Sequence, residues 1–159
     1  MKPTSKPSPK SDAASTSPNP DSSNAAVRHH LKLGWWALLL FLTFGIVLEA
    51  LHAFKNGYYL NTTNQTRRFM WTLAHAHGTL LALINLAFAT TLPLLNLAPK
   101  RRKLASILLS SATILMPAGF FLGGLVFYGG DPGFGILLLP LGAVFLLTAV
   151  FMAARATRA

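Results

Sequence analysis

The sequence predicts an all-α polytopic membrane protein, an antiparallel bundle of four transmembrane helices preceded by a disordered N-terminal tail. Three observations support this fold class. The chain of 159 residues is 52% hydrophobic and only 11% charged, whereas a soluble domain is about 25% charged. Long uncharged stretches occupy most of residues 33–154. The 14 lysines and arginines flank or precede these stretches, as cations do in the loops at a membrane surface.

Residues 1–30 differ in composition from the rest of the chain. This segment is rich in Ser, Pro and Lys, with six hydrophobic residues and no aromatic residue. Such a segment cannot bury enough apolar surface to offset the entropy lost on ordering its backbone. We therefore expect a disordered cytoplasmic tail over 1–30 and a membrane domain over 31–156. Because the first apolar run starts after residue 30 and continues for a full span, we expect an uncleaved signal anchor.

Each uncharged stretch is long enough for one helix across the bilayer. A hydrocarbon core of about 30 Å needs about 20 helical residues, and the stretches lack the two-residue alternation of barrel strands. Lipid offers no partner for backbone N–H and C=O groups, so helices are the remaining solution. The first stretch reaches full length only by carrying Glu49 and His52 through to Phe54. The predicted helices cover about 33–54, 69–93, 104–128 and 133–154.

The linkers predict how the helices are threaded. Those at 99–103 and 129–133 are too short to cross the membrane, so consecutive helices are antiparallel. Eleven Lys and Arg residues fall on the side of the termini and the second linker, against three on the other side. This asymmetry predicts cytoplasmic termini, in what we expect to be a bacterial cytoplasmic membrane. It also accounts for the net charge of +10, so no nucleic-acid partner is expected.

One acid and three histidines lie within the predicted helices: Glu49, His52, His75 and His77. A charge in hydrocarbon costs at least ~2.5 kcal/mol, so each is a candidate functional group that faces the bundle. Glu49 and His75 lie about 8 and 9 Å below the outer ends of their helices, nearly level. Glu49 and His52 share one helix face, like the Glu-x-x-His pairs of metal-binding bundles.

His75 and His77 are separated by about 200° of helix rotation and point to opposite sides. The most economical metal site therefore contains Glu49, His52 and one of these two histidines. If His75 faces the first helix, His77 faces the third or fourth helix or lipid; the reverse assignment is also open.

Small residues gather at the level of these histidines, including Gly45, Gly78 and Gly119. Either helices approach closely there, which is the commoner reason for such spacing, or the small side chains leave room for a ligand. Asn85 lies on the same side of the second helix as Gly78. We expect its amide to bond to another helix and to contribute about 0.6–2 kcal/mol.

The segment Trp71–Gly78, with Glu49 and His52 before it, resembles small four-helix membrane proteins that carry a His-x-His motif early in the second helix. That resemblance covers about 30–154 and implies the fold but no established activity. The same segment is similar, over fewer than ten residues, to histidine-bearing helices of the heme-copper oxidase and nitric oxide reductase families. The chain is too short for an oxidase catalytic subunit, and neither resemblance assigns a ligand.

Three functional hypotheses follow. The main interpretation is a scaffold or accessory subunit of a membrane complex, in which Glu49 bonds to His75 or His77 and fixes helix register. Its partners would be the bilayer, other subunits or further copies of the chain. Alternatively, Glu49, His52, His75 and His77 supply ligands to a transition metal ion or a b-type heme, because imidazole suits iron, copper and zinc. A third hypothesis has Glu49 and a histidine relaying protons or ions.

The sequence contains no cysteine, which excludes disulfides and thiolate chemistry. It also lacks a nucleophile triad, a phosphate-binding loop, a dinucleotide fingerprint and an HExxH zinc motif. Independent catalytic activity is therefore not expected.

Overall fold

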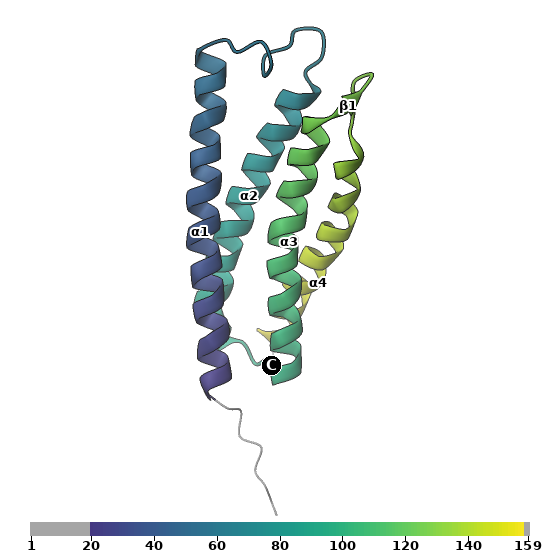
Figure 1. The fold of residues 1–159 in the computed structure, drawn as a ribbon. Coiled ribbons are helices and arrows are strands. Elements are labelled where there is room, and N and C mark those ends of the chain that lie inside the picture. Colours follow the sequence, from purple (N-terminus) through teal and green to yellow (C-terminus); the bar gives the residue numbers. More distant parts are fainter. Residues whose placement is uncertain (1–19, 158–159) are drawn as a thin grey trace, which may run out of the picture.

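A computed structural model describes residues 20–157, with side chains from residue 24 onward. Within this range all four α-helices, two of them extended by short 3-10 turns, are long and apolar enough to cross a membrane. The predicted all-α class is confirmed, and the chain has the features of a membrane protein. The helices are α1 (Pro20–Ala53), α2 (Thr66–Thr91), α3 (Pro99–Leu125) and α4 (Leu138–Ala156) (Figure 1).

The first helix begins well before the predicted start at residue 33. Residues 20–30, assigned from composition to the tail, instead belong to α1; the rest of the predicted tail, 1–19, lies outside the described residues. Proline suits the first turn of a helix, where its missing N–H would have no partner anyway. Ala26 and Val27 pack against a core that includes Phe88 and Leu92. An average over the whole tail hides these packing residues.

The third helix also begins earlier than predicted. α3 starts with Pro99 at its first turn, so the basic residues 100–103 are helical instead of forming a linker. Long Lys and Arg side chains tolerate this position because they extend toward water from an otherwise apolar helix. A 3-10 turn, η1 (Leu92–Leu94), follows α2 and leads to the short linker before α3.

A small β-hairpin connects the third and fourth helices. Strand β1 (Phe127–Tyr128) pairs antiparallel with β2 (Asp131–Pro132). Gly129 and Gly130 form the turn with φ values of 57° and 105°, which residues other than glycine rarely adopt. A second 3-10 turn, η2 (Phe134–Leu137), then enters α4.

Consecutive helices pack against one another as antiparallel neighbours. α2 packs against α1 and α3, and α3 packs against α4, whereas α1 meets α3 only over a short stretch. Figure 1 shows α1 and α3 standing apart, with α2 behind them. We call the end that carries residues 95–103 and the end of α4 the basic end. The opposite end, with residues 54–65 and the β-hairpin, is the loop end.

Small residues bring these helices into close contact. A Cβ atom added at Gly78 would lie 2.3 Å from the Phe41 ring, and one at Gly45 would lie 2.5 Å from the His75 ring. Both distances are far below van der Waals contact, so neither glycine leaves space for a ligand. At these two positions the helices approach closely, as the first of the two interpretations of the small residues expects, and the second interpretation, room for a ligand, does not apply.

Arg67, in the first turn of α2, closes the loop end. Its guanidinium donates hydrogen bonds to the carbonyl oxygens of Gly124 at 3.2 Å and Leu125 at 3.4 Å, and to that of Tyr58 at 2.9 Å. The last carbonyls of a helix lack intrahelical partners and carry partial negative charge. Arg67 therefore caps the C-terminus of α3 and ties it to the loop after α1.

Candidate functional site

His75 faces α1 and is engaged with its backbone. Its Nδ1–H donates to the carbonyl oxygen of Phe41 at 2.8 Å, and the half-buried ring lies directly over Gly45. Because a carbonyl only accepts, Nδ1 carries a proton. The bond joins α1 to α2 near the middle of their contact.

His77 points to the other side of α2, as the 200° rotation predicts. Its ring packs against Phe120 of α3, with centroids 4.6 Å apart. Its Nδ1–H donates to the carbonyl of Leu73 in its own helix at 2.9 Å. Of the two assignments open at the sequence level, the structure has His75 toward the first helix and His77 toward the third.

Glu49 and His52 share a face of α1, as expected, but both side chains are exposed. The described residues contain no hydrogen bond from Glu49 to His75 or His77; each histidine instead donates from Nδ1 to a backbone carbonyl. They also contain no group of three or more His, Cys, Asp or Glu residues placed to hold a metal ion. The four predicted site residues are therefore not brought together as one ligand set.

The structure instead brings together a polar cluster toward the basic end. His30, buried on α1, pairs its Nδ1 with Oδ1 of Asn85 on α2 at 2.7 Å and its Nε2 with Oγ of Ser106 on α3 at 2.6 Å. The Asn85 amide nitrogen donates to Oγ1 of Thr113 on α3 at 2.7 Å and to the carbonyl of Leu81 at 2.8 Å. We call His30, Asn85, Ser106 and Thr113 the polar cluster; it links three helices.

The partners fix the proton positions in this cluster. The Leu81 carbonyl only accepts, so the nitrogen of the Asn85 amide must face it and the amide oxygen must face His30. His30 therefore donates from Nδ1, and in the neutral ring Nε2 accepts from the Ser106 hydroxyl. Thr113 accepts from Asn85 and donates to the carbonyl of Leu109 at 2.8 Å. The groups are mutually satisfied, as buried polar groups need to be.

The expected interhelical bond of Asn85 is thus confirmed, but His30 was missed because residues 1–30 were assigned to the tail. A signal was available in the spacing of α1. His30, Gly34 and Ala37, all buried, lie at positions i, i+4 and i+7, which share one helix face. Following the buried face of α1 from Ala37 and Gly34 toward the N-terminus leads to His30. The neighbouring His29 is exposed and pairs its Nε2 with Oγ of Ser110 at 3.0 Å.

Comparison with protein-family models, with curated proteins and with solved structures gives no match to this chain.

Proposed function

We propose that this protein is an accessory subunit of a membrane complex and that the loop-end half of α1 contacts its partner. In the same proposal the basic end and both termini lie in the cytoplasm, as the distribution of cations favours. The observation that carries the proposal is Glu49, which is exposed on α1 inside a candidate membrane span.

An exposed acid at this place is costly if it faces only lipid. Glu49 lies four residues, about 6 Å, before the end of α1 at Ala53. An ionised side chain costs about 2.5 kcal/mol or more at the bilayer centre, and less toward the interface. A partner helix that donates a hydrogen bond or a positive charge to the carboxylate would remove that cost.

The surroundings of Glu49 define the chemistry of the partner. Ile46 and Val47 are exposed large apolar residues on α1, while the exposed Ala50 and Ala53 are small. Small residues allow helix backbones to approach, and buried polar groups strengthen such contacts. A transmembrane helix carrying Lys or Arg at the depth of Glu49 fits this surface.

The other polar groups of the spans support a structural role over a catalytic one. His30, His75, His77 and Asn85 hydrogen-bond to neighbouring helices or to their own backbone. Among the buried side-chain polar atoms of the described residues, only Thr79 Oγ1 and Arg102 Nε lack a partner. Buried polarity here serves to hold helices together, which is what a subunit built for packing needs.

Photocrosslinking in native membranes tests the proposal. A photoreactive amino acid at position 47, beside Glu49, should give an adduct with another membrane protein, identified by mass spectrometry. The adduct should be lost in Glu49→Gln, which keeps the shape of the side chain and removes its charge. It should persist in Asp131→Asn, because that acid lies in the β-hairpin outside the helices.

A second probe at position 147 serves as the background control, because Leu147 is an exposed apolar residue on α4. If positions 47 and 147 give only lipid adducts, the proposal is overturned. It is also overturned by an adduct of twice the mass of the chain, which would mean that α1 pairs with a second copy. An adduct that survives Glu49→Gln would show that the acid plays no part.

A further inference from the structure

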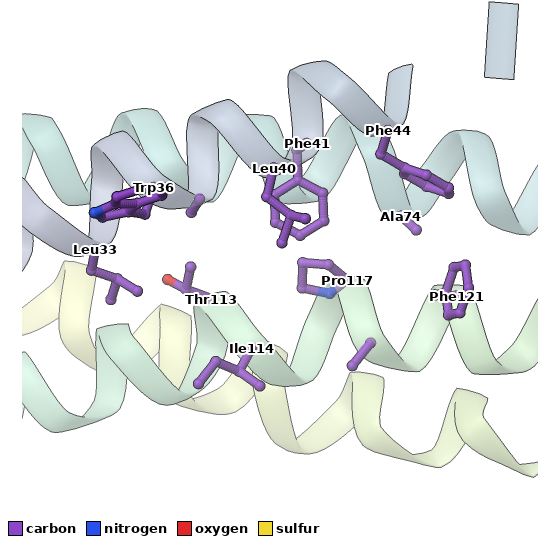
Figure 2. A pocket seen from close by; sticks show the side chains of 12 residues that line it. Leu33, Trp36, Leu40, Phe41, Phe44, Ala74, Thr113, Ile114, Pro117 and Phe121 are labelled. Atoms are coloured by element: carbon purple, nitrogen blue, oxygen red, sulfur yellow. The ribbon is translucent and has the colours of Figure 1, made fainter. Parts of the chain in front are cut away.

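The faces of α1 and α3 that stand apart enclose an apolar groove with α2 at its base. It forms a cavity of about 720 Å³. Its only hydroxyl, that of Thr113, is already occupied by the polar cluster. The groove therefore offers almost only hydrocarbon contacts, and the indole N–H of Trp36 is the other polar group of its lining. Figure 2 shows it between Leu33, Trp36 and Phe41 on α1 and Ile114, Pro117 and Phe121 on α3.

A second cavity, of about 480 Å³, lies between the same two helices at the basic end. Ala25 and Ala26 of α1 line one side, and Lys100, Arg102 and Lys103 of α3 line the other. These cations belong to the first turn of α3, where the unpaired N–H groups of the helix also favour an anion. Both acids whose side chains are described, Glu49 and Asp131, lie toward the loop end.

The Arg102 side chain at this cavity is incompletely paired. Its Nη2 donates to the carbonyl of Leu97 at 3.5 Å, at the long limit of a hydrogen bond. Its buried Nε has no partner among the described residues. A guanidinium held this weakly has donors left for an anion, and a phosphate suits its planar fork.

The two cavities lie along the same helix faces. Ala26 and Leu33 are seven residues apart on α1, and Ile107 and Ile114 are seven apart on α3; each pair contains one residue from each cavity. Seven residues bring a helix back to nearly the same face about 10 Å further along. His29 and Ser110 lie between the cavities and are hydrogen-bonded across the two helices. The order from the basic end is thus cationic, polar and apolar.

We propose that the two cavities, with the His29–Ser110 contact between them, form one crevice that binds one anionic phospholipid from the leaflet at the basic end. The phosphate sits beside Lys100, Arg102 and Lys103, the ester region lies level with His29 and Ser110, and one acyl chain fills the apolar groove. The order of charges and polarity along the crevice matches the order of chemical groups in such a lipid. Basic pockets between transmembrane helices bind anionic head groups by the same electrostatics.

Native mass spectrometry of the full chain in a neutral detergent tests this site. We expect one phosphatidylglycerol to be retained in preference to phosphatidylcholine of the same chain length. The double variant Lys100→Gln/Lys103→Gln should weaken phosphatidylglycerol binding roughly tenfold or more. The matched control, Lys55→Gln/Arg68→Gln, removes the same charge at the loop end and should leave binding unchanged. Equal retention of the two lipids, or equal binding by the two double variants, would overturn the proposal.

The apolar groove needs its own test. Ile114→Trp places a larger side chain in the groove and should weaken binding of the lipid. Leu147→Trp should not, because Leu147 is an exposed residue of α4 outside the groove. Glycerol phosphate at millimolar concentration should fail to displace phosphatidylglycerol, because a free phosphate lacks the acyl chain. Displacement by glycerol phosphate, or unchanged binding in a folded Ile114→Trp protein, would overturn the role of the groove and reduce the site to a phosphate contact.

Discussion

Asn85 on α2 forms side-chain hydrogen bonds to both α1 and α3, so this one residue links three helices. It is completely buried, with His30 on one side and Thr113 on the other. Its amide oxygen accepts from His30, and its amide nitrogen donates to the Leu81 carbonyl and to Thr113. Exchanging the amide oxygen and nitrogen would therefore break these hydrogen bonds. An amide in this position specifies how α1, α2 and α3 register along one another, which uniform apolar packing would leave less well defined.

We expect Asn85→Leu to lower the free energy of unfolding in detergent by about 1–2 kcal/mol. Leucine has a similar size but leaves His30 Nδ1–H without its acceptor, and interhelical bonds in membranes contribute about 0.6–2 kcal/mol each. Denaturation followed by circular dichroism measures the change. Asn96→Leu, in the linker before α3 where the side chain is exposed, is the control. Equal stabilities of the two variants would show that the polar cluster contributes nothing.

Polar residues could be recognised from the sequence when they interrupt an apolar stretch. Asn85, His75 and His77 stand out in this way, and both the interhelical role of Asn85 and the opposite directions of the histidines follow from helix geometry. His30 could not be found from composition, because it lies between Arg28 and Lys32, at the end of a segment with few apolar residues. The sequence also places Glu49 on α1 but does not reveal that its face is left uncovered.

Among the elements, α3 shows how a membrane helix is ended by a side chain from another helix. It ends in glycine and leucine, and no residue of its own last turn is basic. Arg67 supplies the positive charge from α2, and its Cζ also lies 3.5 Å from the centroid of the Tyr58 ring. The next residue, Arg68, donates only to Gln65 at 2.7 Å among the described residues.

Replacing Arg67 with Gln should therefore destabilise the loop end, with a loss of about 2 kcal/mol in the free energy of unfolding. Arg68→Gln removes the same charge and should change it by less than about 0.5 kcal/mol. Hydrogen exchange of residues 54–65 and 124–130 should rise only in the Arg67 variant. Similar exchange in both variants would mean that charge alone, and not the cap, holds this end.

Element boundaries were harder to predict than element number. Four helices follow from the lengths of the apolar stretches, but α1 and α3 both start earlier than the apolar stretches do. In each case a proline opens the helix, and polar or basic residues occupy its first turns. Hydropathy locates the part of a helix that lies in lipid, whereas helix formation depends on backbone hydrogen bonding and continues into the interface.

At the scale of the whole molecule, the charge distribution predicts which side each end occupies. The chain has no cysteine, so single-cysteine variants report one site each. Thr62→Cys, at the loop end, should react with a membrane-impermeant maleimide in intact cells. Ala98→Cys, at the basic end, should react only after the membrane is permeabilised, because cation-rich loops stay in the cytoplasm. Labelling in the reverse order would mean that the proposed orientation is inverted.

The members of the polar cluster are synthesised one helix at a time, because they lie on three successive helices. Synthesis delivers α1 to the bilayer first, carrying an imidazole whose partners lie on helices that do not yet exist. Asn85 arrives with α2, and Ser106 and Thr113 arrive with α3. Among the described residues α4 supplies no member of the cluster. A nascent chain halted after α2 would leave His30 half satisfied, whereas one halted after α3 would contain every partner in the cluster.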